Sequence, residues 1–166
     1  MAAPIIRIEE LPPLVGGRGA LFGLDLGTKT IGIAVSDADW RLAVPVETIV
    51  RKKFTPDVER LLHLAAERRI AALVLGLPVN MDGTEGPRAQ ATRAFARNLA
   101  NLTAMPIALW DERLSTAAVE RSLIEQDVSR ARRAEVIDQH AAAFILQGAL
   151  DRLRHLKAAA DEEGAD

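Results

Sequence analysis

The feature that most constrains the fold is a change of hydrophobic period near residue 50. Before it, three apolar, strand-like runs follow one another with only short turns between them, at residues 20–26, 31–35 and 42–50. Parallel strands need long crossover connections, so runs joined by such short turns must form an antiparallel meander. The sequence therefore predicts that three antiparallel strands begin the folded part of the chain.

After residue 50 the apolar residues recur at helical spacing and alternate with short strands. Thr55, Pro56 and Asp57 are typical of a helix start, with a capping hydroxyl, a proline in the first turn and an acid near the positive end of the dipole. Further helices are expected from Gly86-Pro87, from Ser115 as a cap, and over about 134–156, and further strands at 71–77 and 107–110. These patterns predict an α/β fold with a five-stranded mixed sheet, its three antiparallel strands first, flanked by helices.

The two ends of the chain differ from its body. Residues 1–19 are rich in proline and glycine, and we expect them to form an irregular N-terminal lead-in. Residues 158–166 are small or acidic, and we expect a disordered tail. A chain of 166 residues fits one domain, which we place at residues 20–157.

Composition excludes several classes of protein. Cysteine is absent, which removes disulfides, thiolate metal sites and a cysteine nucleophile. No apolar run is long enough for a membrane span and the N-terminus lacks a signal-peptide layout, so we expect a cytoplasmic protein without membrane contact. The net charge of −2 does not indicate nucleic-acid binding, which would have to depend on local basic clusters such as 51–53 and 130–133.

Carboxylates occur at three places where an apolar residue or a plain turn would be expected. Asp138 lies on the apolar stripe of the last helix, and Asp25 interrupts an apolar first strand. Asp111 and Glu112 close the fifth predicted strand, at the edge where ligands of open sheets gather. Each has an ordinary alternative: a buried ion pair, a side chain bonded to its own turn, or a surface pair with Arg113.

Together these acids indicate a metal site. Two acids at strand ends and one on a facing helix can converge on one point, and oxygen ligands without His or Cys suit Mg²⁺ or Mn²⁺. A pair of such ions would activate water and stabilise the leaving oxygen in phosphodiester cleavage.

Three blocks of the chain carry a resemblance to a known family. They are residues 25–37 (DLGTKTIGIAVSD), residues 76–84 (GLPVNMDGT) and residues 111–116 (DERLST), the last continued by Asp138 and the alanines at 141–143. In this order and spacing the chain resembles the YqgF family, also called RuvX, of ribonuclease H-like nucleases. The predicted strand order is also the one that a ribonuclease H-like sheet requires.

The resemblance implies a function and a set of catalytic residues. The function is maturation of the 5′ end of 16S ribosomal RNA, and the family is also labelled a Holliday junction resolvase by its likeness to RuvC. Asp25, Glu112 and Asp138 would be the catalytic acids that bind Mg²⁺ or Mn²⁺, with Asp111 as the alternative to Glu112. The chain departs from the family around Asp138, where residues 135–137 are Glu, Val and Ile and residues 139–140 are Gln and His.

Four polar residues are predicted to contact substrate. They are Thr28, Lys29, Asn80 and Arg113, each of which has the alternative of an ordinary turn or ion-pair residue. The expected partners are pre-16S rRNA or branched DNA, together with the assembling small ribosomal subunit. A non-catalytic RNA-binding module is the competing hypothesis, and a single chain of this length is too short for a two-domain, actin-like kinase.

Overall fold

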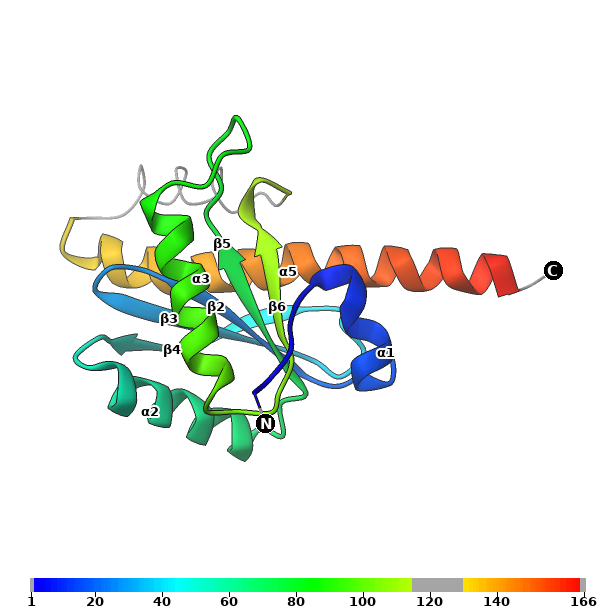
Figure 1. Cartoon of the computed structure of the whole chain (residues 1–166), viewed down its shortest axis with the longest axis horizontal. Helices are drawn as coiled ribbons and strands as arrows, with labels where there is room; N and C mark the ends of the chain where they lie inside the picture. The colour runs from blue at the N-terminus through cyan, green and yellow to red at the C-terminus, as the bar shows by residue number, and fades with distance from the viewer. Residues whose placement is uncertain (1, 115–129, 165–166) are drawn as a thin grey trace.

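The computed structural model describes residues 2–114 and 130–164, and the backbone alone for residues 130–139 (Figure 1). The strands are β1 (Ile5–Arg7), β2 (Leu21–Leu26), β3 (Thr30–Ser36), β4 (Ala43–Val50), β5 (Ala72–Leu77) and β6 (Ile107–Asp111). The helices are η1 (Ile8–Glu10), α1 (Leu11–Val15), α2 (Phe54–Glu67), α3 (Pro87–Ala100), η2 (Glu112–Leu114) and α5 (Arg130–Gly164).

The strands form one mixed sheet in the order β1-β6-β5-β2-β3-β4. β2, β3 and β4 pair antiparallel, whereas β5 pairs parallel with both β2 and β6. The prediction of a mixed α/β sheet with the antiparallel strands first is confirmed. The predicted number of five strands is wrong, because β1 adds a sixth strand parallel to β6.

The sixth strand lies in the segment that was expected to be an irregular lead-in. β1 has three residues, a run too short for its side chains to show a period, and it is added at the sheet edge where the N–H of Ile107 donates to the carbonyl oxygen of Pro4 (2.9 Å). η1 and α1 follow, and they bury Ile8 and Leu11. Residues 5–15 are therefore regular structure packed on the sheet.

The last helix also exceeds its expected length. α5 continues to Gly164, through most of the segment expected to be a disordered tail, and Figure 1 shows this end extending beyond the sheet. Alanine and glutamate have high helix propensity, which allows an exposed helix to continue past its packed part. The helix that Ser115 was predicted to cap lies outside the described residues.

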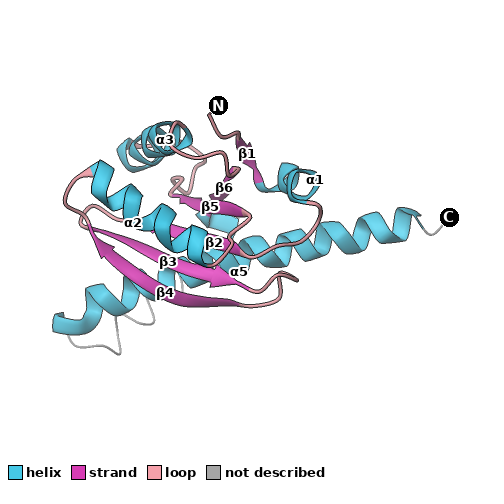
Figure 2. Cartoon of the chain, turned by 90° about the horizontal axis from the view of Figure 1, so that it is seen from below, coloured by secondary structure: helices cyan, strands magenta, loops and turns pink. Residues whose placement is uncertain are grey.

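Helices cover both faces of the sheet (Figure 2). On one, which we call the α2/α3 face, Phe22 and Leu24 pack in a core with Val58, Leu61 and Phe95. On the other, the α5 face, residues of α5 such as Ile145 and Leu146 pack with Leu21 and Val74. Successive strand residues point to opposite faces, so the pleat of β2 assigns alternate side chains to the two cores.

The start of α2 differs in detail from its prediction. The helix begins at Phe54 after the N-cap residue Lys53, without a capping side chain, so Thr55 is not its cap. Instead the buried carboxylate of Asp57 accepts the backbone N–H of Lys52 at 3.1 Å. Over the part of the chain with described placement, no helix is long and apolar enough to cross a bilayer.

We predict that Gly23→Ala destabilises the fold by about 1–3 kcal/mol, because an added methyl overpacks the contact between β2 and α5. A Cβ at Gly23 would lie 2.5 Å from the Cβ of Leu146 and 3.0 Å from the carbonyl oxygen of Ala142. Urea unfolding measures the change. Gly164→Ala, where a Cβ meets nothing within 4 Å, is the control; equal unfolding midpoints for the two variants would contradict the prediction.

Candidate active site

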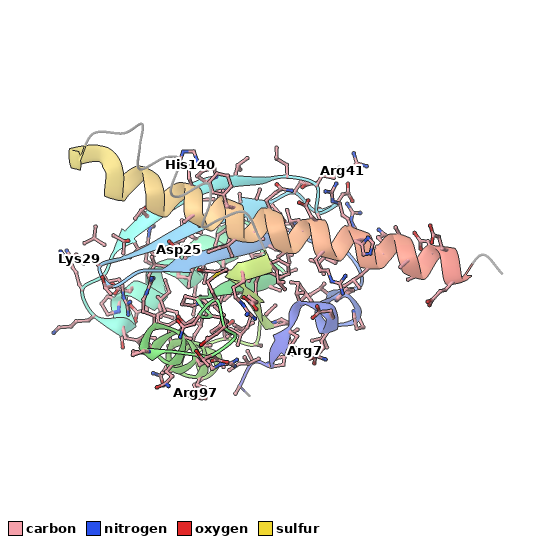
Figure 3. The ribbon with its side chains drawn as sticks, turned by 90° about the horizontal axis from the view of Figure 1, so that it is seen from above. Arg7, Asp25, Lys29, Arg41, Arg97 and His140 are labelled. Carbon is pink, nitrogen blue, oxygen red and sulfur yellow. The ribbon has the colours of Figure 1, made fainter. Side chains whose placement is uncertain are left out.

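Asp25 lies near the carboxyl end of β2 on the α5 face. Leu21 packs in the core of that face, and a Cβ at Gly23 would touch Leu146 of α5. Two residues further on, Asp25 points to the same side. Its side chain is 6% exposed although it carries a carboxylate, and Figure 3 shows it beside α5. The structure thus places an acid in the apolar layer between the sheet and its long helix.

Glu112 reaches the same face from β6. It is the first residue of η2, directly after the strand ends at Asp111. A Cβ at Gly76 of β5 would lie 2.7 Å from Oε1 of Glu112 and 2.6 Å from Cδ1 of Ile145 in α5. The carboxylate of Glu112 therefore lies over Gly76 on the α5 face, in space that any larger residue at position 76 would fill.

The sheet register brings Asp25 and Glu112 toward each other. β5 lies between β2 and β6; Leu24 pairs with Leu75, and Gly76 pairs with Trp110. By this register Gly76 lies beside Asp25 of the neighbouring strand, and the Glu112 carboxylate lies over Gly76. Two predicted metal ligands are thus on the same face of the sheet, with Gly76 between them.

Asp111 faces the other way. Ile107 and Leu109 of β6 pack in the core of the α2/α3 face, and the pleat assigns Asp111 to that side. Its carboxylate accepts the backbone N–H of Arg113 at 2.9 Å and Nη2 of the same residue at 2.7 Å. The side-chain hydrogen bond from Arg113 holds the pKa of Asp111 below its usual range. Glu112 is therefore favoured over Asp111 as the partner of Asp25.

The side chain of Asp138 lies outside the described residues, but its helix is placed. Gln147 of α5 accepts the N–H of Ala43 in β4 at 2.9 Å, and through Ser36 of β3 this residue is level with the amino end of β2. Ala142, earlier in α5, lies over Gly23 in the middle of β2. α5 therefore runs from the carboxyl end of β2 toward its amino end, with residue 138 one turn before Ala142, toward Asp25. Within the described residues no three acids or histidines form a metal-binding group; the predicted set of three includes Asp138, whose side chain lies outside them.

Asn80 and Arg113 share a cavity with Glu112. This cavity, which we call the Glu112 cavity, has a volume of about 270 Å³. It is lined by Pro78, Val79, Asn80, Met81, Gly86, Pro87, Arg88, Glu112 and Arg113. The structure thus brings together three of the predicted site residues around one opening.

Both polar residues also have a structural contact there. The Asn80 side-chain amide donates to Oγ1 of Thr84 at 3.0 Å, inside a turn that Gly83 completes with a φ of 89°. Arg113 forms its two-pronged pair with Asp111. Asn80 and Arg113 therefore have the ordinary structural roles that were weighed for them, in a turn and in an ion pair, and they also line the cavity.

Thr28 and Lys29 lie in the turn between β2 and β3, and both are exposed. Thr28 lines a second, smaller cavity of about 60 Å³, which we call the Thr28 cavity. Lys29 lines neither cavity, and Figure 3 shows it at the outer edge of the molecule. The two neighbours are thus separated, with Thr28 at a cavity that α3 also lines and Lys29 at the outer edge.

Two arginines near the cavities were not among the predicted site residues. Nη1 of Arg51 donates to the carbonyl oxygen of Gly27 at 2.6 Å, and its guanidinium lies 5.8 Å from the Phe95 ring centre. The residue that was predicted as part of a basic cluster thus holds the turn after Asp25. Arg88 lines both cavities, a position that no local sequence signal reveals. The side chains of the second basic cluster, 130–133, lie outside the described residues.

The chain is similar to curated proteins over almost its whole length. A protein of Bradyrhizobium diazoefficiens is 74% identical over 157 residues, which cover 95% of this chain and 98% of the relative. A protein of Rhodopseudomonas palustris strain TIE-1 is 73% identical over 159 residues, with 96% and 99% covered. Both relatives carry the name "Putative pre-16S rRNA nuclease".

Similarity to solved structures is weaker. RuvC of Thermus thermophilus in complex with a Holliday junction substrate gives a TM-score of 0.47 at 13% identity, over 80% of this chain and 93% of that one. The yeast mitochondrial Holliday junction resolvase Ydc2 also gives a TM-score of 0.47, at 11% identity, over 95% and 83% of the chains.

A family model described as "RuvX: Holliday junction resolvase" matches residues 19–152, a range that contains the three sequence blocks, the glycines beneath the acids and the residues of both cavities. With that match and with relatives above 70% identity along the whole fold, the chain belongs to the RuvX family.

Proposed function

We propose that this protein is a ribonuclease H-like, metal-dependent nuclease that hydrolyses phosphodiester bonds to mature the 5′ end of pre-16S rRNA. The observation that carries the proposal is the placement of Asp25 and Glu112 on one face of the sheet, across Gly76. The names of the relatives support the RNA substrate. The description of the family model favours a second candidate, cleavage of Holliday junctions.

The residues at the site fit a hard divalent cation. A carboxylate that is 6% exposed is costly in its charged form, and a second carboxylate nearby increases that cost. Oxygen donors of this kind suit Mg²⁺ or Mn²⁺, which would be held by Asp25, Glu112 and Asp138. When bound, such ions supply an activated water and neutralise charge on the departing oxygen.

The surrounding residues position the acids and the substrate. Gly76 leaves room for Glu112, and Arg51 holds the Gly27 carbonyl in the turn after Asp25. Asn80 and Arg113 line the Glu112 cavity and Thr28 lines the Thr28 cavity, and a strand would be bound across the two. Lys29, on the outer edge of the same turn, would contact a more distant part of the substrate.

We expect Asp25→Asn and Asp138→Asn each to lower cleavage about a hundredfold or more, because each removes a charged metal ligand. The assay uses a 5′-extended 16S precursor and a synthetic four-way DNA junction, each with Mg²⁺, Mn²⁺ or chelator. Asp151→Asn is the control, since this exposed acid of α5 pairs with Arg154 far from the site. Metal-dependent cleavage that survives Asp25→Asn contradicts the mechanism.

The two substrates separate the candidate functions. Cleavage of the RNA alone, lost in both variants, supports pre-16S maturation. Cleavage of the junction alone moves the function to DNA recombination. Binding of RNA without any cleavage favours a non-catalytic assembly module.

A pair of neighbouring substitutions tests which acid of β6 takes part. Glu112→Gln is expected to abolish metal-dependent cleavage to the same extent as Asp25→Asn, because its carboxylate lies on the α5 face. Asp111→Asn is expected to cost less than about tenfold, since it disturbs only the pair with Arg113. Rates measured under saturating Mn²⁺ decide the matter, and the reverse ranking would assign the ligand to Asp111.

Gly76→Ala is expected to reduce cleavage about tenfold or more and stability by about 1–3 kcal/mol. The new methyl must displace the Glu112 carboxylate or the end of Ile145, each within 2.7 Å of it. Cleavage rates and urea unfolding are measured on the same preparation, with Gly164→Ala as the control. A fully active Gly76→Ala protein would show that the close fit over Gly76 has no part in the reaction.

A further inference from the structure

Arg88 lies between the turn that follows Asp25 and the cavity that contains Glu112. It is the second residue of α3, and its exposed side chain lines both the Glu112 cavity and the Thr28 cavity. The Glu112 cavity adjoins the end of β6, and the Thr28 cavity is lined in part by the turn after β2. Of the residues with described side chains, Arg88 is the one common to the two cavities.

Three arginines close to Arg88 in the fold form structural contacts, whereas Arg88 does not pair with an acid of the described residues. Arg113 is paired with Asp111 at 2.7 Å, and Arg93 donates to Glu85 at 2.8 Å. Arg51 donates to the Gly27 carbonyl. Among the side chains that the structure describes, no acid pairs with Arg88. Its cation also lies at the positive end of the α3 dipole, where a basic residue does not stabilise a helix.

An anion is the ligand that this position favours. A guanidinium group binds phosphate oxygens through two parallel hydrogen bonds, and it keeps its charge at all physiological pH values. Glu112 lines the same cavity as Arg88 and repels a polyanion, so a cation at this rim favours the binding of phosphates there. Arg88 has this position on the side of the site formed by α3.

The aromatic residues indicate that the strand is held through its backbone. The chain has no Tyr, two Trp and four Phe. Trp40, Trp110, Phe22 and Phe95 are each no more than 5% exposed, so they are not available to stack on bases. Contacts to phosphates carry no sequence information directly.

We propose that Arg88 binds the substrate's sugar-phosphate backbone where one strand crosses the start of α3, from the Thr28 cavity to the Glu112 cavity, independently of base sequence. This inference rests on the proposed nuclease function for its substrate class. It adds a substrate-binding residue that acts beside the metal ligands rather than on the metal.

Binding measured without cleavage tests the proposal. Fluorescence anisotropy in chelator follows two labelled single-stranded RNAs of equal length, one with the 16S 5′-leader sequence and one with that sequence scrambled. Arg88→Gln is expected to weaken binding of both RNAs about 10- to 100-fold, the range for loss of a charged hydrogen bond. It should also lower the slope of log affinity against log salt by about 0.7, the loss of one phosphate contact on a single strand.

Two further variants serve as controls. Arg88→Lys keeps the charge and should retain most of the salt slope. Arg97→Gln removes an exposed arginine from the last turn of the same helix and should bind like the wild type. Thermal unfolding confirms that each variant is folded.

The outcomes separate this inference from the proposed function. Wild-type affinity and slope in Arg88→Gln overturn the inference, as does a loss confined to the leader sequence. If Arg88→Gln weakens binding but the wild-type protein cleaves neither RNA nor junction, the contact stands and the nuclease proposal fails. If the wild-type protein binds neither RNA, with chelator or with Mg²⁺, both fail.

Discussion

The site depends on how closely α5 approaches the middle of the sheet. Two glycines on the α5 face allow this approach: Leu146 packs directly on Gly23, and Ile145 packs directly on Gly76. A helix at this distance covers the carboxyl end of β2, and Asp25 is buried there although its side chain is a carboxylic acid. Because Gly76 has no side chain, the carboxylate of Glu112 also fits over it. Tight packing and placement of the acids are therefore one feature of the fold.

Charge is arranged in two zones around this contact. Asp25 is buried and Glu112 half-buried on the α5 face of the sheet, where negative charge is costlier than in water. Guanidinium groups lie on α3 and after β6, where Arg88 and Arg113 line the Glu112 cavity. A centre that attracts cations, surrounded by groups that attract anions, suits the binding of a metal ion and a polyanionic strand at one place.

Much of the fold follows from local pattern. The antiparallel meander, β5, β6 and the helices between them could be predicted, because turn spacing and hydrophobic period are set by neighbouring residues. β1 could not, since a three-residue strand acquires its identity by pairing with Ile107 and its neighbours, about a hundred residues away in the chain. The helical start of α2 at Phe54 likewise depends on Asp57 reaching back to Lys52, a contact that propensity does not reveal.

The sequence by itself determined which acids lie at strand ends, because the apolar runs that contain or precede Asp25 and Glu112 stop where the strands stop. Strand position alone did not separate Asp111 from Glu112, which only the family resemblance favoured, and no local signal pointed to Gly76 or Arg88. The tertiary structure decided these points. The pleat of β6 and the pair with Arg113 turn Asp111 to the far face, while Glu112 fits over a glycine of the neighbouring strand. Such choices depend on contacts between segments distant in the chain, which only packing of the whole sheet against its helices brings together.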